Sequence, residues 1–171
     1  MLKRILILGL VLLSLMACSS QPEQMPAEQR EAVLSTLKTQ LEKSGVTIIH
    51  LGQESMLVLP ADTFFFPDSS HLNGQYYGTL NAIRDYISLF DVETVKVGGY
   101  SDNCGDPLRA LALSRQQAQN IAAYLKNQAI KAPIIYSTGY GCTFPIADNR
   151  RTDGRAMNRR IQITFYRLNM K

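Results

Sequence analysis

The chain lacks tryptophan altogether and has only two histidines and three cysteines among its 171 residues. His50 and His71 lie far from the cysteines in the sequence, and no Cys-x-x-Cys pair is present. Structural zinc sites are built mainly from such residues, and hydrolytic enzymes use a metal, paired carboxylates or a nucleophile beside a base. The sequence therefore predicts no metal site and no cofactor, and it does not favour an enzyme.

Long apolar runs are also scarce. The run at the N-terminus, Ile5–Leu15, follows Lys3 and Arg4 and is too short to span a bilayer as a stable anchor, which is typical of an export signal over residues 1–17. It ends in Leu-Met-Ala-Cys18, similar to a bacterial lipobox, so we expect Cys18 to carry lipid (palmitate among its acyl chains). A plain secretory signal with an unmodified cysteine is the alternative. Ser19, rather than Asp, after the cysteine indicates an outer-membrane lipoprotein with its domain in the periplasm.

A large excess of charge is missing too. The formal charge of +4 falls to +2 once Lys3 and Arg4 are removed with the signal, so nucleic acid is not a predicted partner. Basic residues nevertheless gather near the C-terminus: Arg150, Arg151, Arg155, Arg159, Arg160, Arg167 and Lys171. They form either a solvated surface, with Asp148 and Asp153 as counter-charges, or the wall of a pocket that binds carboxylates.

The spacing of apolar residues predicts one α+β domain. Residues 18–26 are polar and are interpreted as a tether, and Val33, Leu34, Leu37 and Leu41 predict an amphipathic helix over residues 27–45. The elements expected after it are a hairpin of strands 46–51 and 56–59, a helix over 74–90, a strand over 94–98, a helix beginning at Asp106-Pro107, and strands over 134–138 and 161–165. This order favours a two-layer sandwich over residues 46–171, with helices on one face of a mixed sheet.

Several short motifs follow one another in the second half of the chain: Gly99-Tyr100-Ser101-Asp102-Asn103, Leu113-Ser114 with Ala118, Gly139-Tyr140-Gly141, and Asn158-Arg159-Arg160. No single motif is specific, but in this order they closely resemble the C-terminal OmpA-like domain, from about Leu57 to Phe165. The resemblance implies the βαβαβ-β fold of that family and non-covalent binding of bacterial peptidoglycan.

The resemblance also implies a ligand, the diaminopimelate side chain of the stem peptide, which offers an ammonium and a carboxylate. Asp102, beside Asn103, matches the family's aspartate. One of Arg159 and Arg160 should match the arginine at the start of the last strand, because a guanidinium pairs bidentately with a carboxylate. Side chains alternate along a strand, so one of these arginines is expected to face the pocket and the other to pair at the surface.

One position departs from the family pattern. The family usually has Leu-Ser-x-x-Arg-Ala on the second helix, and here Gln117 stands in the place of that arginine. Arg115 lies about 200° away round the helix and cannot substitute for it. Loss of a charge-assisted contact typically removes about 1.5–3 kcal/mol, tenfold or more in affinity. Gln117 is therefore expected to be a weak substitute in a weakened pocket.

If Cys18 carries lipid, Cys104 and Cys142 are the two cysteines left to form a disulfide. Each follows a predicted strand, and an oxidising periplasm favours a disulfide between them, provided that the two strands are parallel neighbours.

Two functions are compatible with these features. The first is a lipoprotein that anchors the outer membrane, or a machine embedded in it, to peptidoglycan. The alternative is a scaffold subunit in a secretion complex, with a weakened or lost peptidoglycan site; the small size resembles an OmpA-like lipoprotein of the Dot/Icm type IVB system. The expected partners are peptidoglycan, the outer membrane and, in the second case, other secretion-complex subunits.

Overall fold

The computed structural model describes residues 25–102 and 105–168. Its helices are α1 (Ala27–Lys43), α2 (Ala61–Phe64), the 3-10 turn η1 (Gly74–Tyr76), α3 (Tyr77–Ser88), α4 (Pro107–Asn127) and α5 (Thr152–Asn158). Its strands are β1 (Thr47–Leu51), β2 (Glu54–Pro60), β3 (Thr94–Tyr100), β4 (Ile134–Gly139) and β5 (Arg160–Tyr166).

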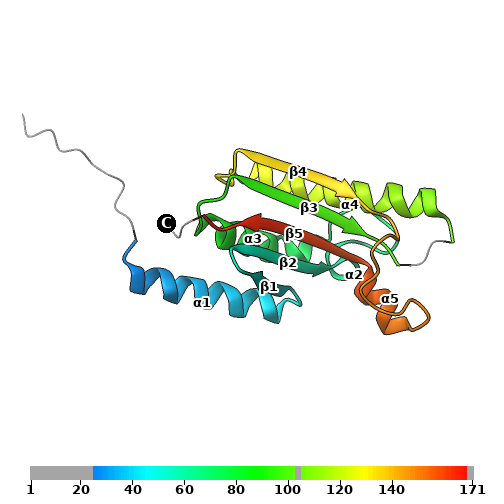
Figure 1. Cartoon of the computed structure of the whole chain (residues 1–171), viewed down its shortest axis with the longest axis horizontal. Helices are drawn as coiled ribbons and strands as arrows, with labels where there is room; N and C mark the ends of the chain where they lie inside the picture. Colours follow the sequence, from blue (N-terminus) through cyan, green and yellow to red (C-terminus); the bar gives the residue numbers. More distant parts are fainter. Residues whose placement is uncertain (1–24, 103–104, 169–171) are drawn as a thin grey trace, which may run out of the picture.

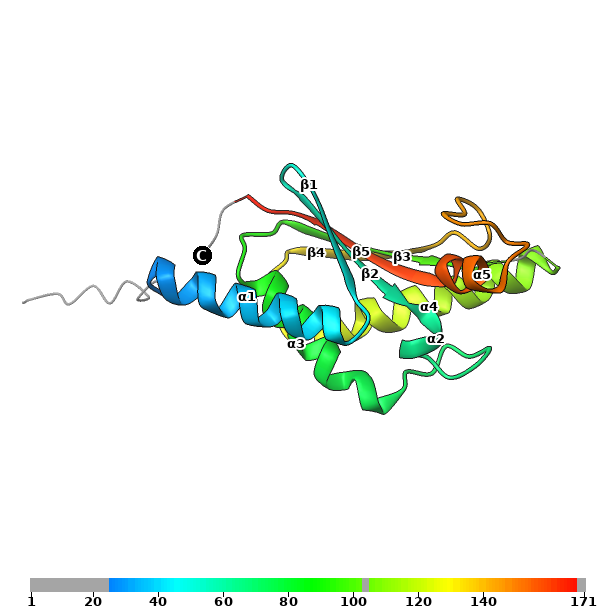
Figure 2. The ribbon, with the colours of Figure 1, turned by 90° about the horizontal axis from the view of Figure 1, so that it is seen from below.

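The strands form one mixed sheet in the order β1-β2-β5-β3-β4. β3 and β4 are parallel neighbours, and the other pairs are antiparallel. Figure 2 shows α1, α3 and α4 on one side of the sheet, with α5 at the end where β5 begins. The predicted two-layer α+β sandwich, with its helices on one face of a mixed sheet, is confirmed.

The core fills the space between the sheet and these helices. Every second residue of the central strands faces it, as the pleat requires: Leu57, Leu59, Val95, Val97, Ile161, Ile163 and Phe165 are all buried. The predicted N-terminal helix, observed as α1, joins the same core, since Leu41 is fully buried and Leu34 and Leu37 pack against it, whereas Val33 is exposed. Within the described residues, no helix is long and apolar enough to cross a membrane.

Two glycines allow α4 to lie close to the sheet. A Cβ atom at Gly99 would stand 2.0 Å from the carbonyl oxygen of Ser114, and one at Gly139 would stand 2.6 Å from the backbone of Arg115. The helix begins where Asp106-Pro107 predicted, because the Asp106 carboxylate accepts hydrogen bonds from the backbone N–H groups of Leu108 and Arg109. This close approach brings α4 beside the end of β3, and Asp102 follows two residues after that end.

The molecule is elongated, and its two ends differ. α1 begins at one end, whereas α2, α5 and the end of β3 lie at the other (Figure 1). The polar residues predicted for the site therefore gather far from the start of α1.

Candidate functional site

A pocket of about 360 Å³ lies where the end of β3 and the start of β5 meet α2 and α4. Its polar lining comes from segments that are distant in sequence: Asp62, Asp68, Ser101, Asp102, Gln117 and Arg159. Ser114 also lines it, but its hydroxyl donates to the carbonyl of Leu111 and accepts from the backbone N–H of Gly141. That hydroxyl therefore fastens the loop after β4 to α4.

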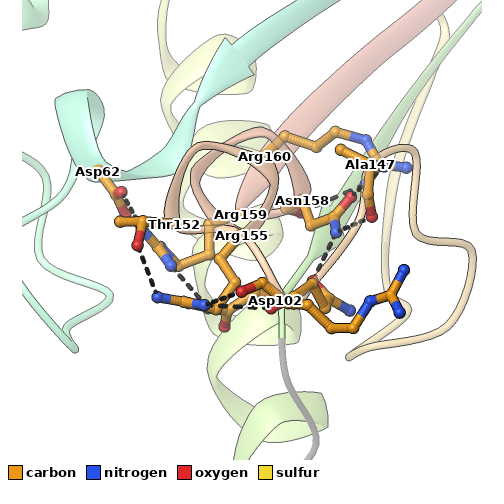
Figure 3. Close-up of polar contacts among 10 residues, drawn as sticks. Asp62, Asp102, Ala147, Thr152, Arg155, Asn158, Arg159 and Arg160 are labelled. Carbon is orange, nitrogen blue, oxygen red and sulfur yellow. Dashed lines mark hydrogen bonds and ion pairs between the residues drawn. The ribbon is translucent and has the colours of Figure 1, made fainter.

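Arg159 connects two carboxylates across this pocket (Figure 3). Its Nε and Nη2 donate to the two oxygens of Asp62 at 2.7 and 2.6 Å, a bidentate pair. Its Nη1 donates to Oδ2 of Asp102 at 2.6 Å. The hydrogen bond to Asp62, and after it the one to Asp102, raises the pKa of Arg159 above its ordinary value. Arg159 is thus a permanent cation that fixes the position of Asp102.

The pocket is nevertheless acidic. Among its described lining residues, three carboxylates face one guanidinium, which leaves a formal charge of −2. Oδ1 of Asp102 accepts no hydrogen bond from the described part of the chain. The carboxylate of Asp102 is also the less exposed of the two that Arg159 binds, at 20% against 52% for Asp62. It is well placed to receive a cationic group.

Gln117 lines the same pocket, as its match to the family's arginine position predicted. It is only 7% exposed, and its Nε2 donates to the carbonyl oxygen of Ser69 at 2.9 Å. Asn120, one turn further along α4, binds the carbonyl oxygen of Ser70 at 2.7 Å in the same manner. These two amides hold the loop that carries Asp68, a residue with a φ of 51°. Gln117 therefore has a structural contact as well as a place in the pocket.

The expectation that the second arginine pairs at the surface was wrong. Arg160 is 3% exposed and lies on the helix-free face, with its guanidinium carbon 3.9 Å from the centre of the Tyr100 ring. Its Nη1 and Nη2 donate to the carbonyl oxygens of Asn158 and Phe144. Tyr100 in turn stacks on Tyr140 at 4.8 Å. Arg160 is held by the Tyr100 ring and two backbone carbonyls, partners that the sequence did not reveal.

Asn158 fixes the segment that leads into the two arginines. Its buried Oδ1 accepts from the backbone N–H groups of Ile146 and Ala147, and its Nδ2 donates to the carbonyl of Ala147 and to Asn149 (Figure 3). All four hydrogen-bonding positions of the amide are thereby used. The contacts fasten the loop of residues 146–149 to the start of β5.

Sequence reasoning missed Asp62. It stands at the start of α2, directly after β2, and the register that places Pro60 opposite Arg160 brings it beside Arg159. Nothing in the local sequence marks Asp62 as a site residue. The pairing of β2 with β5 was the missing information.

Several predicted positions lie outside the described residues: Cys18, Asn103 and Cys104. Cys142 is partly buried in the loop after β4, and the parallel pairing of β3 with β4 supplies the condition that was set for its disulfide with Cys104. That disulfide stays a prediction. No group of three or more histidine, cysteine or acidic side chains able to hold a metal occurs within the described ranges.

Comparison with known proteins identifies the family. Residues 64–159, more than half of the chain, match the model of the OmpA family, so the chain belongs to that family. It is 30% identical over 129 residues to the probable lipoprotein YiaD of Escherichia coli, covering 75% of this chain but 59% of YiaD. It is 31% identical over 162 residues to the outer-membrane lipoprotein YfiB of Pseudomonas aeruginosa, covering 94% of this chain and 92% of YfiB.

The fold is similar to that of solved structures as well. The cell wall anchor of the T6SS from Pseudomonas aeruginosa superposes with a TM-score of 0.71 at 27% identity. The match covers 78% of this chain and 96% of the anchor. The resemblance that the motifs between Gly99 and Arg160 indicated is therefore confirmed for the fold.

Proposed function

We propose that this protein is an outer-membrane lipoprotein whose OmpA-like domain binds peptidoglycan non-covalently and anchors the outer membrane, or a machine within it, to the cell wall. The observation that carries the proposal is the pocket in which Asp102 and Arg159 present opposite charges beside Gln117. Relatives and the structural neighbour support it, because two are lipoproteins and one is a cell wall anchor.

The pocket suits the diaminopimelate side chain of a stem peptide. Oδ1 of Asp102 can accept the ammonium, since Oδ2 is the oxygen that binds Arg159. A guanidinium has five N–H donors, and three of those of Arg159 bind Asp62 and Asp102. Two donors are left for a ligand. Asp62 and Asp102 largely balance the positive charge of Arg159, so we infer that the contact of Arg159 with a ligand carboxylate is weak.

The shape of the molecule fits an anchor. α1 has 17 residues and is about 25 Å long, and it begins at the end opposite the pocket (Figure 1). A lipid on Cys18 would hold that end at the membrane. The pocket at the far end would then be directed toward the cell wall.

The pocket is tested by sedimentation with purified sacculi. The wild type should sediment with them, and Asp102→Ala should lower the bound fraction about tenfold, because it removes a charge-assisted contact. Asp85→Ala is the matched control, since it removes an aspartate of α3 that pairs with Arg84 away from the pocket. Equal binding by the wild type and Asp102→Ala would contradict the proposed site.

The membrane anchor is tested separately by metabolic labelling with palmitate. The wild type should incorporate the label and fractionate with the outer membrane, whereas Cys18→Ser should do neither. A wild type that fractionates as free periplasmic protein with Cys18 intact would contradict the lipoprotein assignment.

A scaffold role in a secretion complex is the second candidate, and Gln117 favours it, because a second cation for the ligand's carboxylate is missing from the described lining. The assignment to a Dot/Icm system stays a prediction from the layout of the chain. Gln117→Arg should raise binding to sacculi, and added salt should remove the gain, since a partly exposed ion pair is screened. If the wild type does not sediment and Gln117→Arg restores nothing, the scaffold role is favoured.

A further inference from the structure

The lining of the pocket has more acidic than basic groups, and this excess affects which chemical form of the ligand it favours. Asp62 and Asp102 together bind Arg159 through three short hydrogen bonds, and Asp68 adds a third carboxylate. A ligand ammonium is therefore attracted. A ligand carboxylate beside it meets three carboxylates and a single guanidinium, which is already paired.

Gln117 supplies an uncharged group to the lining of the pocket. Because its Nε2 faces the carbonyl oxygen of Ser69, which can only accept, the orientation of the amide is fixed. Oε1 is left as an acceptor for the pocket, and Nε2 keeps a second hydrogen. This pair of atoms complements a primary carboxamide, which also offers one donor and one acceptor. A carboxylate, which only accepts, would set its oxygens against Oε1.

We propose that this pocket prefers a stem peptide whose diaminopimelate side chain ends in a carboxamide, with its ammonium free, over the form with a free carboxylate. The preference rests on the proposed peptidoglycan function. Asp102 binds the ammonium, Arg159 positions Asp102, and the amide of Gln117 pairs with the carboxamide. A lysine stem peptide shares the ammonium and lacks the carboxylate, but it offers Gln117 no partner.

The test is a calorimetric titration of the wild type with three synthetic tripeptides, L-Ala-γ-D-Glu followed by diaminopimelate, its side-chain amide, or L-lysine. The amide should bind about tenfold more tightly than the free acid, with lysine between them. Binding of the free acid at least as tight as that of the amide overturns the preference alone. Binding of none of the three, together with no sedimentation on sacculi, overturns the proposed function itself.

Two variants separate recognition by Gln117 from its structural contact. Gln117→Arg should reverse the order, so that the free acid binds more tightly than the amide. Asn120→Ala is the matched control, because Asn120 holds the same loop through Ser70 but does not line the pocket; it should keep the wild-type order. If Asn120→Ala abolishes the preference, the amide of Gln117 acts only through the loop and the proposal is wrong.

Discussion

Two arginines that follow each other at the start of β5 lie on opposite faces of the sheet and in unlike surroundings. Arg159 faces the pocket, remains about one third exposed, and binds the carboxylates of Asp62 and Asp102. Arg160 is buried on the helix-free face against the Tyr100 ring and two backbone carbonyls. Exposed ion pairs contribute little to stability, whereas removing a buried group leaves its partners unsatisfied at a larger cost. We therefore expect Arg159 to serve binding and Arg160 to serve the fold.

The largest effect should come from removing the side chain of Asn158, which fastens the loop of residues 146–149 to the segment before the two arginines. Asn158→Ala leaves two part-buried backbone N–H groups and a carbonyl without their partner. We expect a loss of about 3–4 kcal/mol in the free energy of unfolding, measured by urea denaturation. Asn149→Ala, which removes one of the same hydrogen bonds, should cost about 1 kcal/mol. Similar losses for the two variants would show that the amide of Asn158 is not the central support.

A smaller loss should follow from Arg160→Ala. The change removes the contact with Tyr100 and the hydrogen bonds to the carbonyls of Asn158 and Phe144. Burial lowers the pKa of Arg160, which shows that keeping the charge there has a cost, so the net loss should be about 2–3 kcal/mol. Urea denaturation measures it. Binding to sacculi per folded molecule should stay at the wild-type level. A specific loss of binding would contradict the assignment of Arg160 to the fold and of Arg159 to binding.

Arg159→Ala should show the opposite pattern. Because its ion pairs are partly exposed, the free energy of unfolding should change by less than about 1 kcal/mol. Binding to sacculi whose diaminopimelate carries a free carboxylate should fall about tenfold, mainly because Asp102, which binds the ammonium, is no longer held in position. Denaturation and sedimentation of the same preparation measure both quantities. A large loss of stability with unchanged binding would reverse the assigned roles.

The sequence predicted the pocket only as far as its motifs reached. Asp102, Gln117 and Arg159 stand in segments that match the family, and they do line one pocket. Asp62 lies outside those segments and enters through the pairing of β2 with β5, a long-range contact that local patterns do not determine. The sequence therefore could not identify Asp62 as a partner of Arg159.

The environment of Arg160 shows a second limit of prediction from the sequence. Alternation along the strand correctly predicted that only one arginine faces the pocket. It could not give the partner on the other face, because Tyr100 and Tyr140 stack there only once β3 and β4 are parallel neighbours. The second arginine was therefore expected to pair at the surface, whereas it is buried against the Tyr100 ring.

The smallest effect concerns the hydroxyl of Tyr100 beneath Arg160. Burial raises the pKa of Tyr100 above its ordinary value of 10.0, although Arg160 opposes the shift. The neutral hydroxyl thus contributes stability that is present below about pH 10 and is lost as the pH rises through the folded-state pKa. Tyr100→Phe keeps the ring and removes this titration. The variant should match the wild type near pH 7 and lose less stability than it at about pH 11, by urea denaturation. Tyr166→Phe, an exposed tyrosine on β5, should follow the wild type. If Tyr100→Phe loses stability as steeply as the wild type at high pH, the hydroxyl is not buried by the stack, and the cation on this face would be as accessible as the one in the pocket.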